Sequence, residues 1–222
     1  FVDFRFTDTK GKWQHTTMVA SEVDKDIIED GLMFDGSSIA GWKTINESDM
    51  ILMPDVATVV LDPFTAQTTA VVCCDVVEPS TGQGYARDPR STAKRAEAYL
   101  AYTGIGYQAF FGPELEFFIF DDARFEVGMN VSFAQVDSEE GPYNSGTEYA
   151  AGNLGHRPKV KGGYFPVQPV DSLNDIRAEM LTTLKHVGLE PVLHHHEVAP
   201  SQNEMGFKFG TLLQTADNVQ KY

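Results

Sequence analysis

The 222-residue sequence is poor in cysteine, and it has no long apolar segment. Its only two cysteines, Cys73 and Cys74, are adjacent. Neighbours in a strand point to opposite faces, so these thiols are poorly placed to bridge each other. This excludes a disulfide-rich secreted scaffold and favours a reducing cytoplasm. Because no run of about 18 apolar residues occurs, we expect that nothing spans a membrane.

Positive charge is also scarce, with 17 basic side chains against 32 acidic ones and a formal charge of −15. Nucleic-acid binding normally requires a basic surface, so we expect no nucleic-acid partner. There is no Gly-x-x-x-x-Gly-Lys-Ser/Thr loop and no Gly-x-Gly-x-x-Gly, which excludes two common nucleotide sites. What is present is ordinary globular composition, with 42% hydrophobic and 22% charged residues.

The first part of the chain is predicted to be a small α+β domain, with one helix on a mixed sheet. Alternating or β-branched apolar residues predict its strands at 1–6, 13–19, 49–62 and 68–77. Ser21 is predicted to cap a short helix over 22–29. A linker rich in Gly, Pro and Ser follows at 78–84.

The second part of the chain mixes helices with apolar strands. Helices are predicted at 88–103, 171–187 and 212–222, and strands at 110–120 and 192–198. Asp88 caps the first of these helices and Pro89 occupies its first position. Residues 123–165 have no clear period and predict a long irregular excursion. The chain starts without Met and stops at Tyr222 within a helical pattern, which we interpret as a fragment of a longer protein.

Two carboxylates interrupt an apolar strand in Gly112-Pro113-Glu114-Leu115-Glu116-Phe117-Phe118. Residues two apart share a face, so Glu114 and Glu116 would lie about 6.6 Å apart along the strand. Their repulsion is roughly 2.5 kcal/mol at an effective dielectric of about 20. Either one carboxyl group is protonated or a cation faces the pair, and Mg²⁺ and Mn²⁺ prefer such oxygen ligands. A solvated outer strand face explains the pattern equally well.

A second segment combines histidines with acidic residues: His194-His195-His196-Glu197, then Gln202-Asn203-Glu204. In a strand, His195 and Glu197 would share one face, and His194 and His196 the other. The chain must then turn, which can bring Glu204 back towards Glu197. Four glutamates with a histidine beside them would be too acidic to stay empty at neutral pH, and they predict two or three bound cations. For each of these residues considered alone, the alternative to metal binding is a structural role or a position on the surface.

A third segment is a loop of small residues, Phe34-Asp35-Gly36-Ser37-Ser38, followed by Gly41-Trp42 and Asn46-Glu47-Ser48-Asp49-Met50. Such a loop can present the Asp35 carboxylate and the Ser38 hydroxyl at its tip. The residue pattern alone favours an ordinary turn, in which Asp35 accepts a hydrogen bond from nearby backbone. The residues therefore predict an acidic protein with a divalent-metal site on a sheet.

Together these three segments resemble the glutamine synthetase family, of the bacterial type. Residues 34–50 resemble the family's N-terminal signature, and residues 112–118 and 194–204 resemble its metal-binding strands. Gly-His-Arg-Pro-Lys-Val-Lys-Gly-Gly-Tyr-Phe-Pro-Val at 155–167 and Gln-Gly-Tyr-Ala-Arg-Asp-Pro-Arg-Ser at 83–91 also match the family. The resemblance covers essentially the whole chain, in order.

The resemblance implies an α+β fold with a β-grasp domain at 1–82. Residues 88–222 would be the first part of a catalytic domain, built on a curved antiparallel sheet and truncated at its C-terminus. It implies a glutamate–ammonia ligase of nitrogen assimilation, which joins ammonium to L-glutamate through a γ-glutamyl phosphate and gives L-glutamine. ATP would be the co-substrate and Mg²⁺ or Mn²⁺ the cofactor. The resemblance also implies a cytoplasmic homo-oligomer, a dodecamer of two six-membered rings. The fragment alone would be inactive.

Residue by residue, the resemblance implies four metal ligands: Glu114, Glu116, Glu197 and Glu204. Asp35 and Ser38 match a loop that reaches into a neighbouring subunit's site, where Asp35 would bind ammonium and accept its proton. His195 matches a position among the catalytic residues. Tyr164 and Phe209 match cofactor-binding positions, with Tyr164 lining the site and Phe209 near the adenine.

Two alternatives keep the fold but change the function. The first is a ligase that uses an amine in place of ammonia, and the pair Asp35 and Ser38 favours ammonia over it. The second is a non-catalytic assembly protein that keeps the ring contacts. Retention of all four glutamates argues against the second alternative, because an abandoned site tolerates their loss.

Overall fold

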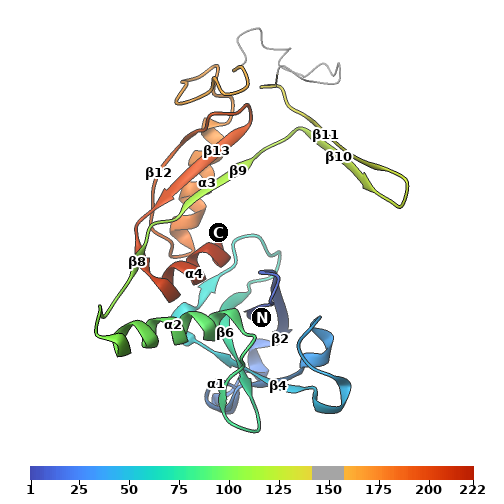
Figure 1. Cartoon of the computed structure of the whole chain (residues 1–222), viewed down its shortest axis with the longest axis vertical. Helices are drawn as coiled ribbons and strands as arrows, with labels where there is room; N and C mark the ends of the chain where they lie inside the picture. Colours follow the sequence, from blue (N-terminus) through green and yellow to red (C-terminus); the bar gives the residue numbers. More distant parts are fainter. Residues whose placement is uncertain (142–157) are drawn as a thin grey trace. The chain divides into compact units, whose positions relative to one another are not determined.

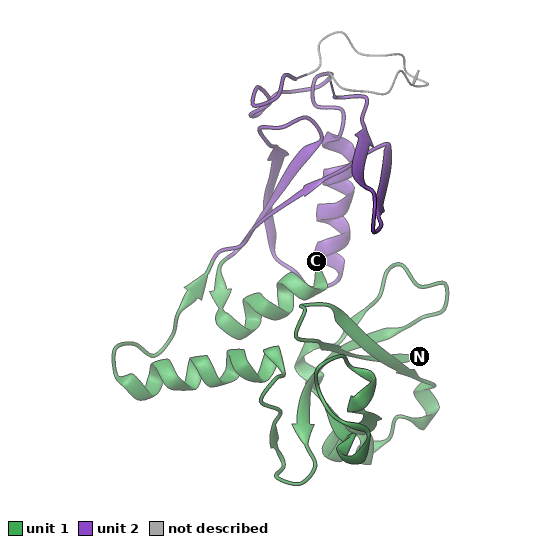
Figure 2. Cartoon of the chain, turned by 45° about the vertical axis from the view of Figure 1, so that its right-hand side comes forward, with its two compact units in different colours: residues 1–111, 209–222 green, residues 112–208 purple. Residues whose placement is uncertain are grey.

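The computed structural model describes residues 1–141 and 158–222, which form two compact units (Figure 2). The first unit comprises residues 1–111 and 209–222, and the second comprises residues 112–208. Residues 155–157, the start of one motif that matches the family, lie outside the described part. Among the described residues, no helix has the length and apolar character needed to cross a bilayer.

The first unit is built on a seven-stranded mixed sheet, in which β2, β4 and β6 are labelled in Figure 1. Five strands follow the order β2-β1-β6-β4-β3, and β5 and β7 each pair with β6 outside this order. Its strands are β1 (Val2–Thr7), β2 (Trp13–Met18), β3 (Leu32–Asp35), β4 (Asp49–Pro54), β5 (Val60–Leu61), β6 (Ala70–Glu78) and β7 (Gln83–Gly84). β1 and β6 run parallel, whereas the other pairs are antiparallel. Four short 3₁₀ helices lie between strands: η1 (Ala20–Glu22), η2 (Gly36–Ser38), η3 (Ile45–Glu47) and η4 (Val56–Thr58).

Alternating apolar residues of the central strands form the core of this unit. Phe4 and Phe6 from β1 pack with Met50 and Leu52 from β4, and the cluster includes Trp42. Burial of these side chains removes apolar surface from water, which is the main favourable term in folding. The predicted strands are therefore present, and they form the predicted mixed sheet.

The short helix α1 (Lys25–Asp30) begins later than predicted. Asp24 caps it, since its carboxylate accepts a hydrogen bond from the Ile27 backbone nitrogen at 3.0 Å. Ser21 lies in η1, where its hydroxyl donates to the Glu22 carboxylate. The prediction of Ser21 as the cap was wrong, because the better-placed acceptor is three residues further on.

Helix α2 (Pro89–Thr103) begins and ends as predicted. The buried Asp88 carboxylate accepts hydrogen bonds from the backbone nitrogens of Arg90 and Ser91, and Gly104 ends the helix with a left-handed φ of 70°. The Arg90 guanidinium is buried and donates to three carboxylates: Asp55 at 2.6 Å, Asp75 at 2.7 Å and Asp217 at 2.9 Å. Asp217 belongs to α4 (Leu212–Lys221), so this one cation joins α4 to α2 and to the sheet.

The second unit contains a three-stranded antiparallel sheet in the order β12-β13-β9, and α3 (Asn174–His186) packs against it. Its strands are β9 (Glu114–Phe118), β12 (Pro191–His196) and β13 (Gln202–Phe207). The single strand predicted over 110–120 is interrupted at Gly112 and Pro113, because proline has no N–H to donate to a ladder. Its first part, β8 (Phe110–Phe111), pairs instead with β14 (Gly210–Thr211) in the first unit.

Part of the predicted irregular excursion is regular structure. β10 (Asp122–Val127) and β11 (Ser132–Asp137) form an antiparallel hairpin, closed by a hydrogen bond from Gly128 N to Val131 O at 2.8 Å. The prediction was wrong over these residues. All of β10 is exposed, so no buried face imposes the alternating pattern that sequence analysis detects.

We expect Arg90→Ala to lower the free energy of unfolding by about 3 kcal/mol, because it leaves Asp55 and Asp217 without their cation and Asp75 with Lys94 alone. Urea denaturation measures the change. The matched control is Lys94→Ala, since Lys94 contacts Asp75 with a side chain that is 40% exposed, and its loss should cost less than about 1 kcal/mol. Equal effects of the two substitutions would contradict the role assigned to Arg90.

Candidate metal centre

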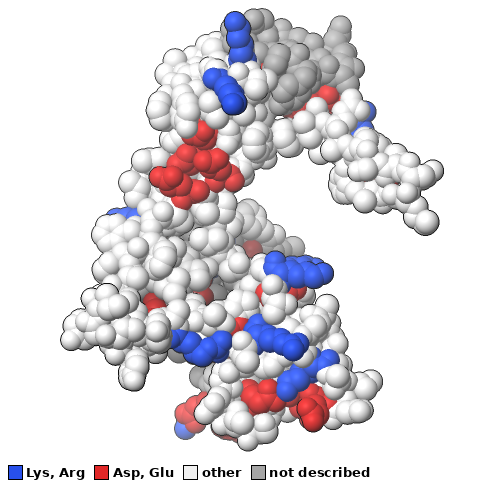
Figure 3. Space-filling view, in the orientation of Figure 1, with Lys and Arg blue, Asp and Glu red and all other residues white. Residues whose placement is uncertain are grey.

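A row of ionisable side chains crosses the three-stranded sheet of the second unit. His195 on β12 is in register with Glu204 on β13, and Glu204 is in register with Glu116 on β9. Direct partners in an antiparallel sheet project from the same face, so these three side chains are neighbours. Glu114 lies on this face too, two residues along β9 and opposite Gly206. Figure 3 shows acidic side chains gathered in a patch over this sheet.

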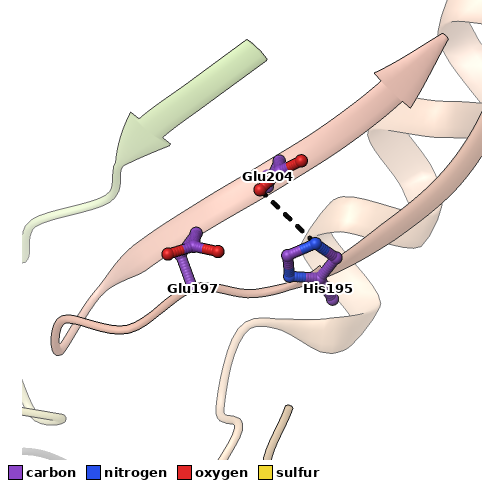
Figure 4. A group of neighbouring side chains, drawn as sticks. All are labelled: His195, Glu197 and Glu204. Carbon is purple, nitrogen blue, oxygen red and sulfur yellow. Dashed lines mark ion pairs between the residues drawn. The ribbon is translucent and has the colours of Figure 1, made fainter. Parts of the chain in front are cut away.

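The turn between β12 and β13 adds a fourth glutamate, Glu197, to this group. Glu197 N donates to Gln202 O at 2.8 Å, which closes the turn directly after β12. One donor atom each from His195, Glu197 and Glu204 then lies within 4.8 Å of the other two (Figure 4). His195 Nε2 is 3.4 Å from the Glu204 carboxylate. The structure therefore brings together residues that are two and seven positions apart in the sequence.

The environment of Glu204 disfavours its charge. Glu204 is only 9% exposed. This burial is the main cause that raises the pKa of its carboxyl group. The positive charge of His195 acts in the opposite direction, and the charges of Glu114, Glu197 and Glu116 raise the pKa further. The other three glutamates thus lie within electrostatic reach of Glu204.

The donor set of this cluster suits a divalent cation. Ligands bound to one Mg²⁺ at about 2.1 Å lie at most about 4.2 Å apart, so donors within 4.8 Å need only small side-chain rotations. Carboxylate oxygens suit Mg²⁺ and Mn²⁺, and imidazole nitrogen is a ligand for transition metals. Glu116 accepts a hydrogen bond from the Gln202 amide at 2.7 Å, which orients this neighbouring carboxylate.

Residues 163–165 line the same cluster. The exposed Tyr164 forms a hydrogen bond with the Glu197 carboxylate, whose charge is the main cause that raises the pKa of the phenol. Phe165 packs edge-on against the His195 ring with centroids 4.7 Å apart, and its φ of 54° is rare for a residue with a side chain. A Cβ on Gly163 would lie 3.0 Å from Glu197 O, a tight contact that would force a shift of a few tenths of an ångström beside Glu197.

The other predicted site residues belong to the first unit. Asp35 is exposed and accepts hydrogen bonds from the Ser37 hydroxyl at 2.6 Å and the Ser37 backbone nitrogen at 2.8 Å. These bonds, the hydroxyl first, lower the pKa of the Asp35 carboxyl group. Ser38 is also exposed at the end of η2, and Phe209 packs edge-on against Phe110 at 5.5 Å. The contacts of Asp35 with Ser37 are those of an ordinary turn, which is the interpretation that the residue pattern alone favoured.

Two neighbours of the cluster were not identified as site residues from the sequence. Phe165 packs edge-on against the ring of His195, and Gln202 donates to Glu116. Gln202 starts β13 two residues before Glu204, so strand alternation could have placed it on the same face. Phe165 gave no such signal, because its contact with His195 joins residues 30 positions apart in an irregular segment.

Fold and cluster together define an α+β protein with a carboxylate-rich candidate site for divalent cations. Two family models match it: "Glutamine synthetase, beta-Grasp domain" over residues 1–79 and "Glutamine synthetase, catalytic domain" over residues 86–222. The chain therefore belongs to the glutamine synthetase family. This confirms the resemblance drawn from the motifs, and it confirms the fold class, a β-grasp domain followed by a catalytic-domain region.

Curated relatives support the same assignment. The chain is 61% identical to a glutamine synthetase of Azospirillum brasilense and 57% identical to one of Rhizobium meliloti, in each case over the whole chain and 47% of the relative. It thus spans about half the length of the curated relatives it matches. A solved glutamine synthetase of Plasmodium falciparum superposes with a TM-score of 0.87 at 26% identity, over 99% of this chain and 43% of that one.

We expect Mn²⁺ to raise the melting temperature of the complete protein that contains these residues. A cation at about 100 times its Kd stabilises a folded protein by about 2.7 kcal/mol. Glu204→Gln should remove most of this stabilisation, because it replaces a central carboxylate by a neutral amide. Differential scanning calorimetry with and without Mn²⁺ measures the effect.

The matched control for that experiment is Glu190→Gln, which removes an equal charge from an exposed ion pair with Lys208 in the same unit. It should leave the Mn²⁺ effect unchanged. A Glu204→Gln protein that Mn²⁺ stabilises as strongly as the unsubstituted protein would contradict the metal centre.

Proposed function

We propose that the protein to which this chain belongs joins ammonium to L-glutamate at the expense of ATP, through a γ-glutamyl phosphate, and gives L-glutamine. The observation that carries the proposal is the convergence of His195, Glu197 and Glu204 beside Glu116. Membership of the glutamine synthetase family supports the choice of reaction. We also propose the domain division 1–82 and 88–222, and action in the cytoplasm.

In this proposal four glutamates hold Mg²⁺ or Mn²⁺: Glu114, Glu116, Glu197 and Glu204. When bound, such cations neutralise the charge of the phosphates and of the substrate carboxylate, which otherwise repel one another. The shared strand face of three of these residues fixes their spacing, and the turn after β12 fixes the fourth. Tyr164, through its hydroxyl on Glu197, and His195, beside Glu204, lie next to these carboxylates.

Asp35 is proposed to bind ammonium and to accept the proton that ammonium must lose before it attacks the acyl phosphate. The hydrogen bonds from Ser37 favour the ionised carboxylate, which suits a cation-binding role. Ser38 follows in the same exposed loop. This role requires a neighbouring subunit, so we propose a homo-oligomer, and by family resemblance a dodecamer of two hexameric rings.

Phe209 is proposed to contact the adenine of ATP. Its ring is 69% exposed and packs edge-on against Phe110, which leaves an aromatic surface available for stacking. ATP, L-glutamate and ammonium are the proposed substrates of the complete protein. Nothing in the acidic composition favours a nucleic-acid partner.

We expect the complete protein to form γ-glutamyl hydroxamate from L-glutamate, hydroxylamine and ATP, with Mg²⁺ or Mn²⁺ required. Asp35→Asn should lower the rate with ammonium by at least tenfold, since general-base catalysis typically contributes about 10² or more. Hydroxylamine is neutral at pH 7 and needs no such proton transfer before attack, so its rate should fall less. The unequal loss for two acceptors is measured in one assay series.

Asp26→Asn serves as the control, because it removes an exposed carboxylate from α1 in the same unit. No hydroxamate above background from the complete protein would refute the ligase. Equal turnover with ammonium and with larger amines would instead support the alternative of an amine ligase.

A further inference from the structure

Behind the row of carboxylates, the opposite face of β12 and β13 carries a buried polar network. His196 points to this face and is 1% exposed. Its Nε2 lies 2.9 Å from the Glu140 carboxylate, and Glu140 is also 1% exposed. Glu140 follows the end of β11, 56 residues before His196, so this contact joins two distant parts of the second unit.

Both oxygens of Glu140 accept hydrogen bonds from backbone N–H groups. Oε1 accepts from Ser172 N at 3.0 Å and from the Ser172 hydroxyl at 2.8 Å. Oε2 accepts from Ser201 N at 2.7 Å, in addition to His196. A backbone N–H can only donate, so each oxygen position needs an acceptor. A carboxylate satisfies both positions, whereas an amide in either orientation would place an N–H group against a backbone N–H.

These contacts hold both ends of the turn that presents Glu197. At its start, His196 Nδ1 lies 2.5 Å from Glu197 O, and because its two ring nitrogens both face acceptors, both must donate. At its end, Ser201 has a left-handed φ of 65°, which a residue with a side chain adopts only when its surroundings impose it. Glu140 contacts the residues that flank the turn on either side.

The strands themselves have a separate anchor. The fully buried Arg177 of α3 donates to His194 Nδ1 at 3.1 Å and to Asn203 Oδ1 at 2.6 Å, and it pairs with Asp171. These bonds hold β12 to β13, and they reach the turn only indirectly, since the Asn203 amide donates to Ser201 O at 2.8 Å. A change at Glu140 should therefore affect the position of the turn more than the pairing of the strands.

We propose that Glu140 is a positioning residue of the metal centre: by fixing the turn between β12 and β13, it sets where the Glu197 carboxylate lies relative to Glu204 and His195. Glu140 touches none of these three side chains, and it acts through His196 and Ser201. This inference rests on the proposed metal-dependent function. Residues that orient metal ligands from behind typically change metal affinity by 10–100-fold when they are altered.

The test is Glu140→Gln in the complete protein, with Mn²⁺ binding and the electron paramagnetic resonance spectrum of bound Mn²⁺ as readouts. We expect Mn²⁺ affinity to fall by about tenfold, and the spectrum of the bound ion to change because its ligand geometry changes. A merely structural effect on the folded fraction would lower the number of sites and leave the spectrum unaltered.

Two controls match the substitution. Glu139→Gln removes the same charge one residue away, and it should leave Mn²⁺ affinity unchanged. Asp88→Asn in the first unit changes another buried carboxylate whose two oxygens both accept backbone N–H groups, from Arg90 and from Ser91 and Val76. It should lower thermal stability and leave the Mn²⁺ spectrum unchanged.

If Glu140→Gln does not fold, Ser172→Ala decides, because it removes only the hydroxyl bond to Oε1 and should lower Mn²⁺ affinity two- to threefold with the same spectral change. A folded Glu140→Gln protein with unchanged affinity and spectrum would overturn this inference alone. An unsubstituted protein that shows no Glu204-dependent Mn²⁺ binding would overturn the proposed function as well. Equal losses in Glu140→Gln and Glu139→Gln would reduce the effect to general electrostatics and also overturn the positioning role.

Discussion

Repulsion between like charges is the constraint on which the second unit depends. Glu197 and Glu204 present oxygens within 4.8 Å, a separation at which two full charges repel by about 3.5 kcal/mol at an effective dielectric of about 20. Glu114 and Glu116 add to the repulsion, and burial of Glu204 adds to the cost of its charge. A divalent cation turns this repulsion into attraction. The strand register and the turn between β12 and β13 hold these carboxylates together against their repulsion.

The two faces of the β12–β13 pair differ in whether their charged side chains have partners of opposite charge. On the reverse face, Arg177 pairs with Asp171, and His196 pairs with Glu140, so each buried charge meets a protein partner of opposite sign. On the front face, four glutamates gather with a single histidine, His195. Buried groups of opposite charge neutralise each other and stabilise the fold. An excess of negative charge instead requires a cation that the chain does not supply. This contrast distinguishes the structural face of the strand pair from the face that carries the candidate site.

The first unit uses the same physical device for a different purpose. Arg90 gathers Asp55, Asp75 and Asp217 around one cation, and the result is a joint between a sheet and two helices. In this cluster the protein itself supplies the positive charge. Acidic residues near one another are therefore not in themselves a sign of a metal, and the geometry of the remaining donors decides.

Much of the fold could be predicted from the sequence, because its signals are local. Alternation in residues 2–6, the Asp88-Pro89 start of α2 and the Gly104 end of that helix each depend on neighbours within a few positions. The same holds for the common face of Glu114 and Glu116, which follows from the two-residue period of a strand. The motifs of residues 34–50 and 194–204 were specific enough to indicate the family, which the comparisons confirm.

Tertiary structure alone decided the rest. The register that sets Glu204 between His195 and Glu116 depends on hydrogen bonds between strands far apart in sequence, and no local pattern determines it. The β10–β11 hairpin escaped prediction because its exposed faces need no alternation, and Ser21 lost the cap of α1 to a better-placed Asp24. Glu140 lay in a segment without period, and only folding brings its carboxylate to His196. The sequence determined which side chains are available; the long-range pairing of the backbone determined which of them meet.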